Sequence, residues 1–533
     1  MKNSRIHTFS TPIEGSLATL TGKYQGLILV GMSRAVSCQR CLSIYFNHNA
    51  KDFWDFGSRM KFKGGYNILL KGRPDIQVKV MPEPDELYLP LRSRRFVFSE
   101  ISVKDGDRVN SGDILAKDPD NHHVPLLAPR AGVVRLKKDK DQIVLEDIAQ
   151  LEEHADIDEE ELSHIEHEMG AAGIKRYRLL TLGAWQFFYD AYTGVLPDPL
   201  GTPQAIIIST MNLEPYLARG DAQLQKRLLN FTRGLEQLQS LLEYQPIYLV
   251  LPKIESEFAD LVRNHIRGYA WVKVMSIPLT YPYDHFGIIA RKLGLGHDKG
   301  PVWGVRTEGV LATDRALTWT KPCTVRIISI AGTKINSPCH IKVMPGYPIK
   351  KIKEQFVFEP APRLINGGIL TGEIIGEETL GLDTECKGIT VLPELRDREF
   401  LGFARPGWGR SCFAGCYLSA LRKKFFERFN TGVRGEGRPC ISCNFCEDIC
   451  PAGITPHLIH KYLYRDLVEE AEQAGTGLCV ECGLCSYVCP SKIDLRQQLI
   501  DAKKLIEKEK EEIRKEQLRQ EEVAKKAAEE KNE

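Results

Sequence analysis

The chain has 533 residues, enough for about three or four domains. Its 72 basic and 70 acidic residues leave a net charge of +2, which argues against nucleic acid as a partner. Hydrophobic residues make up 43% of the sequence, and the longest apolar runs fall far short of the roughly 18 residues that a membrane span requires. Any association with a membrane is therefore expected to be peripheral.

Residues 1–59 differ from the rest of the chain. They have no sustained hydrophobic period, and they lack the basic head, apolar core and small-residue cleavage site of a signal peptide. A regular pattern begins only at Met60. We therefore treat residues 1–59 as an atypical extension and Met60 as a candidate start.

Short alternating strands are predicted within residues 60–145. They meet at glycine turns such as Asp105-Gly106 and Ser111-Gly112. The stretch resembles the barrel-sandwich fold of biotinyl and lipoyl carrier domains. Such domains present a lysine on one hairpin, whereas residues 118–123 read Asp-Pro-Asp-Asn-His-His here, so no covalent cofactor is expected.

An acidic linker at 146–169 precedes an α/β region at 170–320. Buried strands are predicted at 205–210, 246–251 and 271–275, with helical apolar stripes between them. This order predicts a parallel, doubly wound, Rossmann-like sheet. The stripes contain Leu224, Leu228, Phe231, Leu235 and Leu238, followed by Phe258, Leu261, Val262 and Ile266.

Short strands return at 321–400, with turns predicted near Pro338, Gly346 and Gly367. This part resembles the soluble-ligand-binding β-grasp (SLBB-like) domain found in electron-transfer subunits. A turn-rich connector follows at 401–430.

The most specific motif lies in residues 431–501. Three cysteines two residues apart are followed, after three residues, by Cys-Pro, and the whole pattern occurs twice. This run holds a [4Fe–4S] cluster, and in two-cluster ferredoxins the cysteine before the proline ligates the other cluster. The predicted ligands are Cys440, Cys443, Cys446 and Cys489 for the first cluster and Cys479, Cys482, Cys485 and Cys450 for the second.

A pair of structural zinc sites is the alternative, since Cys-x-x-Cys pairs also bind zinc. Tetrahedral zinc needs two such pairs and gives no reason for a third thiol at the same spacing. Two [4Fe–4S] clusters are therefore favoured, and two adjacent clusters conduct electrons. Apolar wrapping of the clusters is expected from Ile441, Phe445, Ile454, Val480, Leu484 and Ile493.

A helical pattern follows the first Cys-Pro. Thr455 is predicted to cap a helix with Pro456 in its first turn, and an apolar stripe continues to Val468. These features predict an α-helical ferredoxin domain. The tail at 502–533 mixes Lys, Arg and Glu, and it is expected to be a solvated helix or a disordered end.

The order of these four domains resembles the C subunit of the Rnf ferredoxin:NAD reductase, including its dicluster ferredoxin part. The middle of the chain is similar to the A subunit of the sodium-translocating NADH:quinone reductase. Together the resemblances cover nearly everything after residue 59. The stretches that carry the second resemblance begin with Lys63-Gly-Gly-Tyr-Asn, Ala205-Ile-Ile-Ile-Ser, Arg363-Leu-Ile-Asn-Gly and Arg398-Glu-Phe-Leu-Gly.

The resemblance implies a peripheral electron-transfer subunit on the cytoplasmic face of the inner membrane. It would belong to an Rnf- or Nqr-type NADH:quinone or ferredoxin:NAD oxidoreductase, where it would be one subunit of an oxidoreductase rather than a complete enzyme. The implied partners are membrane redox subunits carrying flavin or quinone, and the implied donor is a ferredoxin or an NADH-oxidising subunit.

FMN and NADH are further cofactors to weigh, because the Rnf C subunit resembles the flavin subunit of respiratory complex I. Its glycine-rich loop lets backbone amides approach phosphates. In this chain, residues 182–188 occupy the position of that loop. They contain one glycine and three aromatic residues, which would fill the space that a phosphate needs. Glu214, before Pro215, and the Tyr-Pro of residues 281–282 retain other features, so Glu214 is the candidate remnant of a flavin or NADH site.

Two other functions remain open. One is a soluble flavin-dependent NADH or ferredoxin oxidoreductase module, and the other is a non-catalytic docking subunit.

The start of the chain gives a first prediction. The A subunit of the quinone reductase characteristically begins with Met, a basic and apolar alternation and then Gly, as Met60-Lys-Phe-Lys-Gly64 does here. We expect the intact mass of the natively expressed protein to correspond to a start at Met60. A mass that includes Met1 would contradict this.

Overall fold

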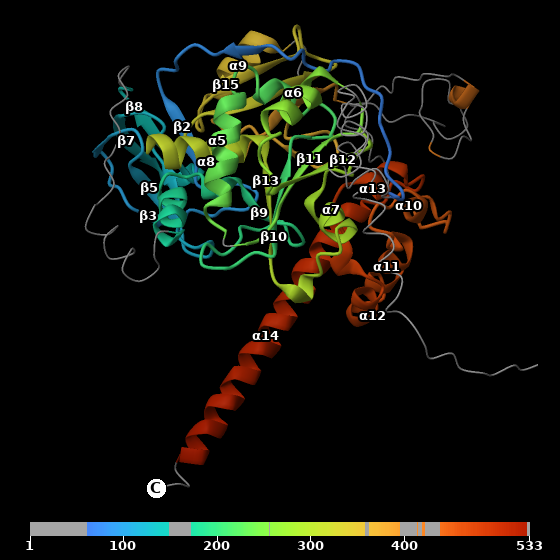
Figure 1. The fold of residues 1–533 in the computed structure, drawn as a ribbon. Coiled ribbons are helices and arrows are strands. Elements are labelled where there is room, and N and C mark those ends of the chain that lie inside the picture. The colour runs from blue at the N-terminus through green and yellow to red at the C-terminus, as the bar shows by residue number, and fades with distance from the viewer. Residues whose placement is uncertain are drawn as a thin grey trace, which may run out of the picture. The chain divides into compact units, whose positions relative to one another are not determined.

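The computed structural model describes residues 61–148, 172–242, 244–254, 256–357, 362–394, 413, 418–421 and 438–529. The chain divides into two compact units, Met1–Phe56 and Gly57–Glu533, and all described residues belong to the second. The predicted extension, and most of the predicted linker and connector, lie outside the described residues. The described part combines several sheets with a group of helices near the C-terminus, so the prediction of a mixed, multidomain α/β chain is confirmed (Figure 1).

A five-stranded sheet forms from residues 188–306, in the order β12-β11-β10-β13-β9. The four strands β10 to β13 run parallel, and β9 pairs antiparallel with β13. The predicted parallel sheet is therefore confirmed. Its strands are β9 (Phe188–Asp190), β10 (Ala205–Ser209), β11 (Ile247–Pro252), β12 (Val272–Ile277) and β13 (Val302–Arg306).

Helices cover both faces of this sheet. Ile206 and Ile208 point into one core with side chains of α5 and α8, whereas Ile207 points into another core with side chains of α7. The covering helices are α4 (Gly220–Gln223), α5 (Leu228–Gln239), α6 (Glu257–His265), α7 (Phe286–Lys292) and α8 (Thr307–Trp319).

The close packing of α5 on α8 depends on Gly234, where a Cβ atom would lie 2.7 Å from the Val310 side chain. Two residues of the predicted stripes behave differently. Leu224 ends α4 instead of joining α5, and Leu261 is 43% exposed. Leu224 is still buried, because it packs into the same core as the apolar side chains of α5.

A six-stranded sheet includes most of the predicted β-grasp region. Its order is β1-β15-β14-β18-β16-β17, and β1 comes from far upstream in the sequence. The strands are β1 (Val78–Val80), β14 (Arg326–Gly332), β15 (Cys339–Val343), β16 (Arg363–Asn366), β17 (Glu373–Ile374) and β18 (Gly388–Leu392), with α9 (Ile349–Phe356) packed on the sheet's core.

Two small antiparallel sheets form from residues 87–146. The first has the order β2-β8-β7-β4 and the second the order β3-β5-β6. The predicted turns at Gly106 and Gly112 are present, with φ of 91° and 96°. The strands are β2 (Leu87–Pro90), β3 (Glu100–Ile101), β4 (Arg108–Val109), β5 (Ile114–Asp118), β6 (Val124–Leu127), β7 (Gly132–Lys137) and β8 (Gln142–Glu146).

Short helices dominate after residue 440. The apolar stripe up to Val468 is divided between two helices, because Asp466 adopts a left-handed conformation with φ of 57°, so the single predicted helix was wrong. Thr455 stands at the N-cap, but its side chain makes no capping hydrogen bond. The helices are α10 (Phe445–Asp448), α11 (Pro456–Leu463), α12 (Val468–Gln473) and α13 (Leu484–Val488).

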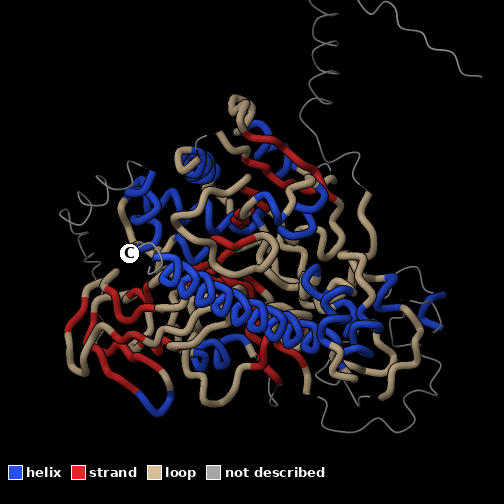
Figure 2. Tube along the Cα trace, turned by 90° about the horizontal axis from the view of Figure 1, so that it is seen from below, coloured by secondary structure: helices blue, strands red, loops and turns tan. Residues whose placement is uncertain are grey.

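The last helix, α14 (Leu495–Glu529), is the long continuous coil in Figure 2. Its first turns bury one stripe, made of Leu495, Leu499, Ala502 and Ile506, whereas residues 507–520 are all exposed. The tail is thus helical as far as Glu529. Within the described residues, no helix is both long enough and apolar enough to cross a membrane.

Arg95 joins three of these sheets. Its guanidinium donates to a carboxylate oxygen of Glu385 at 2.5 Å, to the carbonyl of Phe188 at 2.9 Å and to the carbonyl of Gln186 at 2.5 Å. Both charged side chains are 11% exposed. Burial disfavours the Glu385 carboxylate, but Arg95 outweighs that effect and lowers the pKa of Glu385 to about 2.

Replacing Arg95 tests this junction. We expect Arg95→Ala to lower the free energy of unfolding by about 3–5 kcal/mol, because Glu385 would remain as a buried, unpaired charge. Arg92→Ala is the matched control, since Arg92 is 68% exposed and its partner Asp141 is 59% exposed, and it should cost less than about 1 kcal/mol. Equal losses in urea denaturation would contradict the role of Arg95.

Candidate functional site

The two cysteine runs adopt the same local backbone. In the first run, Ser442 and Asn444 have φ of 55° and 62°, and in the second run Glu481 and Gly483 have φ of 54° and 77°. These residues lie two and four positions after the first cysteine of each run. Alternation of right- and left-handed residues turns successive N–H groups toward one concavity, the arrangement that binds anions and many iron–sulfur sites.

One such donor is visible. The N–H of Glu481 lies 3.3 Å from the sulfur of Cys479 and donates to it. The helices that follow the turns carry the third cysteine of each run, Cys446 in α10 and Cys485 in α13. The repeated motif in the sequence therefore corresponds to a repeated structure.

The last cysteine of each run interacts electrostatically with a cysteine of the other run. Burial, and then the neighbouring thiols of Cys479 and Cys450, raise the pKa of Cys482. Burial, and then the thiols of Cys443 and Cys489, raise the pKa of Cys446 to about 12.

We call the two groups the first half-site, which consists of Cys440, Cys443, Cys446 and Cys489, and the second half-site, which consists of Cys450, Cys479, Cys482 and Cys485. In the first, the Pro439 carbonyl before Cys440 accepts a hydrogen bond from Ser491, two residues after Cys489, at 2.9 Å.

The second half-site borders a small hollow. Its four thiols line the hollow together with Val480, Leu484 and Leu499, so the donors are sulfur and much of the wall is apolar. Soft thiolates in an apolar setting suit iron–sulfur clusters. The residues present therefore fit such a group.

In the part of the chain that the structure describes, no three His, Cys, Asp or Glu side chains converge on a position for a single metal ion. The predicted apolar wrapping is partly present. Ile454, Val480 and Leu484 are buried, but Ile441 is 67% exposed, so its predicted wrapping role was wrong. Ile441 lies in the extended segment before α10, which leaves its side chain in solvent.

The second candidate site involves Glu214, and its carboxylate is already occupied. It accepts hydrogen bonds from the N–H of Leu370 at 3.1 Å, the N–H of Thr371 at 2.8 Å and the Thr371 hydroxyl at 2.6 Å. Glu214 is 8% exposed. In this structure it therefore ties the parallel-sheet region to the loop between β16 and β17.

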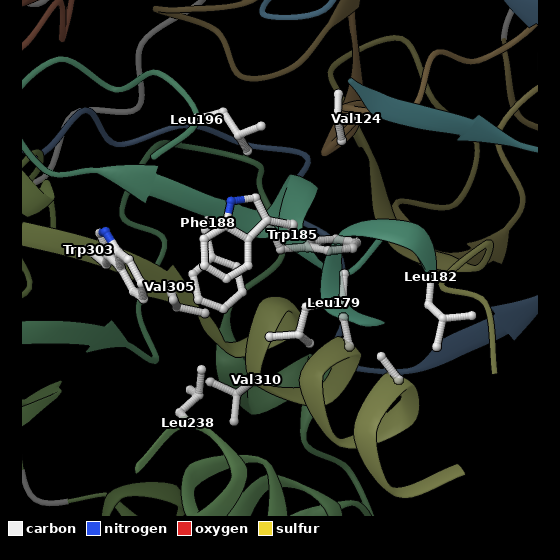
Figure 3. Close-up of a cluster of buried hydrophobic side chains, with 14 of the residues drawn as sticks. Val124, Leu179, Leu182, Trp185, Phe188, Leu196, Leu238, Trp303, Val305 and Val310 are labelled. Atoms are coloured by element: carbon white, nitrogen blue, oxygen red, sulfur yellow. The ribbon is translucent and has the colours of Figure 1, made fainter. Parts of the chain in front are cut away.

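The aromatic stretch at 182–188 is part of a hydrophobic core (Figure 3). Trp185 stacks on Phe188 with ring centroids 4.4 Å apart, and Trp303 of β13 meets both rings edge-on. Trp185 and Phe188 are fully buried. Side chains thus fill the space where a glycine-rich loop would leave room for a phosphate.

A small hollow lies at the carboxyl ends of β10 and β13. The strand order reverses between these two strands, which is where open α/β sheets bind ligands. Arg306, Arg326 and Lys387 line the hollow, as do Glu308 and Tyr189. Burial alone would raise the pKa of Tyr189, but Lys387 and Arg95 outweigh it and lower that pKa to about 8.

His285 directly precedes α7 and follows Asp284, whose carboxylate pairs with Arg306, a residue that lines this hollow. Its Nδ1 accepts the N–H of Gly287 at 3.2 Å, at the start of α7. Burial, followed by the positive charges of Arg306, Arg291 and Lys503, lowers the pKa of His285 to about 3. Arg306 lines the hollow. Arg291 donates to the carbonyl of Leu478, next to the second half-site, and Lys503 donates to the carbonyl of Cys479 within it.

Two parts of the chain match known protein families. Residues 171–317 match the family described as the NqrA second alpha/beta domain, and residues 436–493 match the family described as a 4Fe-4S dicluster domain. The second match contains all eight predicted ligands.

The chain is also similar to curated proteins over most of its length. It is 26% identical over 413 residues to the A subunit of the Na(+)-translocating NADH-quinone reductase of Neisseria meningitidis serogroup B, covering 77% of this chain and 89% of the relative. For the same subunit of Glaesserella parasuis the identity is 24% over 415 residues, covering 78% and 91%. The chain thus resembles this A subunit and carries a ferredoxin-like region at its C-terminal end.

Two solved chains of an NAD+-reducing [NiFe]-hydrogenase are more distant. The air-oxidised form gives a TM-score of 0.33 at 12% identity, covering 44% of this chain and 49% of the hydrogenase chain. The H2-reduced form gives 0.36 at 11% identity, covering 64% of both chains.

The state of His285 predicts a pH dependence of stability. An unfolded histidine takes up a proton below about pH 6.5, whereas folded His285 stays neutral down to about pH 3. The stabilisation by neutral His285 is therefore fully present above pH 6.5. Between about pH 6.5 and pH 3, the free energy of unfolding falls by about 1.4 kcal/mol for each unit by which the pH is lowered. His285→Gln should weaken the acid dependence of the unfolding free energy by that slope, and identical slopes in both proteins would contradict the neutral state.

Proposed function

We propose that this chain is a peripheral electron-transfer subunit of an Rnf- or Nqr-type membrane-associated oxidoreductase complex. The observation that carries the proposal is that Cys450 of the first run lines one hollow together with Cys479, Cys482 and Cys485 of the second run. It supports an exchange of the fourth ligand between two adjacent [4Fe–4S] clusters. Bound there, such clusters would accept and release single electrons. The chain's own residues supply the thiolates, orient N–H donors toward sulfur and exclude water.

The relatives support the type of complex. They are subunits of a Na(+)-translocating NADH-quinone reductase, so membrane redox subunits are the expected partners of this chain. A ferredoxin or an NADH-oxidising subunit is the proposed donor. The corresponding location is the cytoplasmic face of the inner membrane.

The proposed domain assignment follows the sequence. It places a barrel-sandwich domain at 60–145, a Rossmann-like domain at 170–320, an SLBB-like β-grasp domain at 321–400 and the ferredoxin domain at 431–501. Strand β1 is an addition, because it extends the six-stranded sheet from within the first of these ranges.

A second candidate function is the flavin-dependent module. The hollow at the carboxyl ends of β10 and β13 favours it, because three cations line that hollow at the reversal of strand order. The filled aromatic stretch and the occupied Glu214 carboxylate argue against it. Stoichiometric FMN in the purified chain would favour this function over a relay without flavin.

Cysteine variants test the exchanged ligands. We expect about eight irons per chain after anaerobic purification, four for each [4Fe–4S] cluster. Cys450→Ser should lose the same EPR signal as Cys482→Ser, and Cys489→Ser the same signal as Cys443→Ser, because each pair belongs to one half-site.

Cys386→Ser is the control, since Cys386 is buried in the core of the six-stranded sheet and should retain all the iron. If Cys450→Ser instead matches Cys443→Ser, the exchange is refuted. A wild-type chain that binds zinc in place of iron would refute the function itself.

A further inference from the structure

Three backbone carbonyls in or next to the second half-site accept hydrogen bonds from donors outside the ferredoxin-like region. The hydroxyl of Tyr281 donates to the carbonyl of Cys482 at 2.7 Å, and the guanidinium of Arg291 donates to the carbonyl of Leu478 at 3.0 Å. The third bond comes from the segment 62–70, where the N–H of Gly65 donates to the carbonyl of Ile449 at 2.8 Å. Each acceptor is a ligand residue or the residue just before one.

These bonds lie within or beside a shared hydrophobic core. Ile68 and Leu70 come from the segment 62–70, Tyr281 and Ile288 come from the parallel-sheet region, and Ile449, Val480 and Leu484 come from the cysteine runs. Tyr281 is 6% exposed. A buried donor or acceptor that loses its hydrogen-bond partner costs free energy. The contact therefore requires these particular partners as well as apolar packing.

Two glycines let the segment 62–70 enter this space. Gly64 and Gly65 have φ of 60° and 78°. A Cβ on Gly65 would lie 2.9 Å from the Tyr281 carbonyl, and a Cβ on Gly64 would meet the backbone of Cys450 at 2.6 Å. The backbone therefore reaches Ile449 only where side chains are absent.

Positive charge also gathers at the second half-site. Arg291 interacts electrostatically with the thiols of Cys450 and Cys479. Lys503 donates to the carbonyl of Cys479 at 3.1 Å, and Arg496 donates to the carbonyl of Glu481 at 2.9 Å. The guanidinium of Arg94 is a fourth cation and lies 3.4 Å from the Glu481 carboxylate. These contacts thus include four cations and one carboxylate.

The first half-site has a different setting. In it, Cys440, Cys443 and Cys489 are partly exposed and Cys446 is buried, whereas in the second half-site Cys479, Cys482 and Cys485 are buried and Cys450 is partly exposed. Exposure to water and local charge are two of the factors that set the potential of an iron–sulfur cluster. The two half-sites are therefore not equivalent.

We infer that Tyr281 and Arg291 are positioning residues of the second half-site, which fix its loops to the parallel-sheet region and raise the reduction potential of the cluster bound there. This inference rests on the proposed function. Reduction adds one negative charge to a cluster, and the nearby Arg291 guanidinium favours the more negative state. The effect should be larger at this cluster than at the other, because Arg291 donates to the carbonyl of Leu478, next to Cys479, and interacts with the thiols of Cys450 and Cys479.

An EPR-monitored redox titration of the anaerobically purified full-length chain tests this inference. In Arg291→Gln, we expect the reduction potential of the second-half-site cluster to shift downward by more than that of the other cluster. The assignment of signals comes from the cysteine variants. Arg267→Gln is the matched control, because Arg267 is an exposed arginine of the same region and should shift neither potential.

Two further variants separate charge from packing. Arg291→Lys keeps the positive charge and should restore most of the potential, whereas an effect equal to that of Arg291→Gln would refute the electrostatic role. Tyr281→Phe keeps the ring but removes the donor, and it should increase hydrogen exchange at the amides around Cys482 without disturbing those around Cys443. Unchanged exchange would refute the positioning role of Tyr281.

The outcomes also distinguish the two proposals. Loss of only the second-half-site cluster in Arg291→Gln supports positioning, and loss of both clusters, or an equal shift of both potentials, contradicts it. A wild-type chain without iron–sulfur clusters would refute the proposed function before the variants are compared.

Discussion

The packing of the second cysteine run against the parallel-sheet region is the constraint on which the candidate site depends. A ferredoxin-like segment alone would leave the Cys482 and Leu478 carbonyls to solvent, whereas Tyr281 and Arg291 occupy them here. The shared core from Ile68 to Leu484 removes water from the same contact. The cluster region is therefore built into the chain rather than attached to it by a tether.

The segment from Tyr281 to Arg291 makes contacts both at the second half-site and beside the hollow of the parallel sheet. Tyr281 and Arg291 contact the second half-site, whereas Asp284, between them in sequence, pairs with Arg306 beside the hollow of the parallel sheet at 2.9 Å. Neutral His285 lies among these cations. One turn and the helix α7 that follows it therefore supply contacts to both places.

The sequence predicted what depends on local pattern. The strands β10, β11 and β12 follow from apolar runs, and the repeated Cys spacing indicates the repeated turns around Asn444 and Gly483. It did not predict contacts between distant segments. Nothing in the local pattern pairs β1 with β15, gives Arg291 a carbonyl partner at Leu478, or binds the Glu214 carboxylate to the backbone of Thr371. The exposure of Ile441 also depends on tertiary packing, which hydrophobicity alone does not reveal.

The central claim is that two clusters lie close enough to exchange electrons within one chain. EPR of the dithionite-reduced, anaerobically purified protein tests it most directly, because two paramagnetic clusters in adjacent half-sites interact magnetically. We expect a spectrum broadened by spin coupling, which becomes a simple single-cluster spectrum when either half-site is removed. A wild-type spectrum that is the plain sum of two non-interacting signals, or the absence of any iron–sulfur signal, would contradict it.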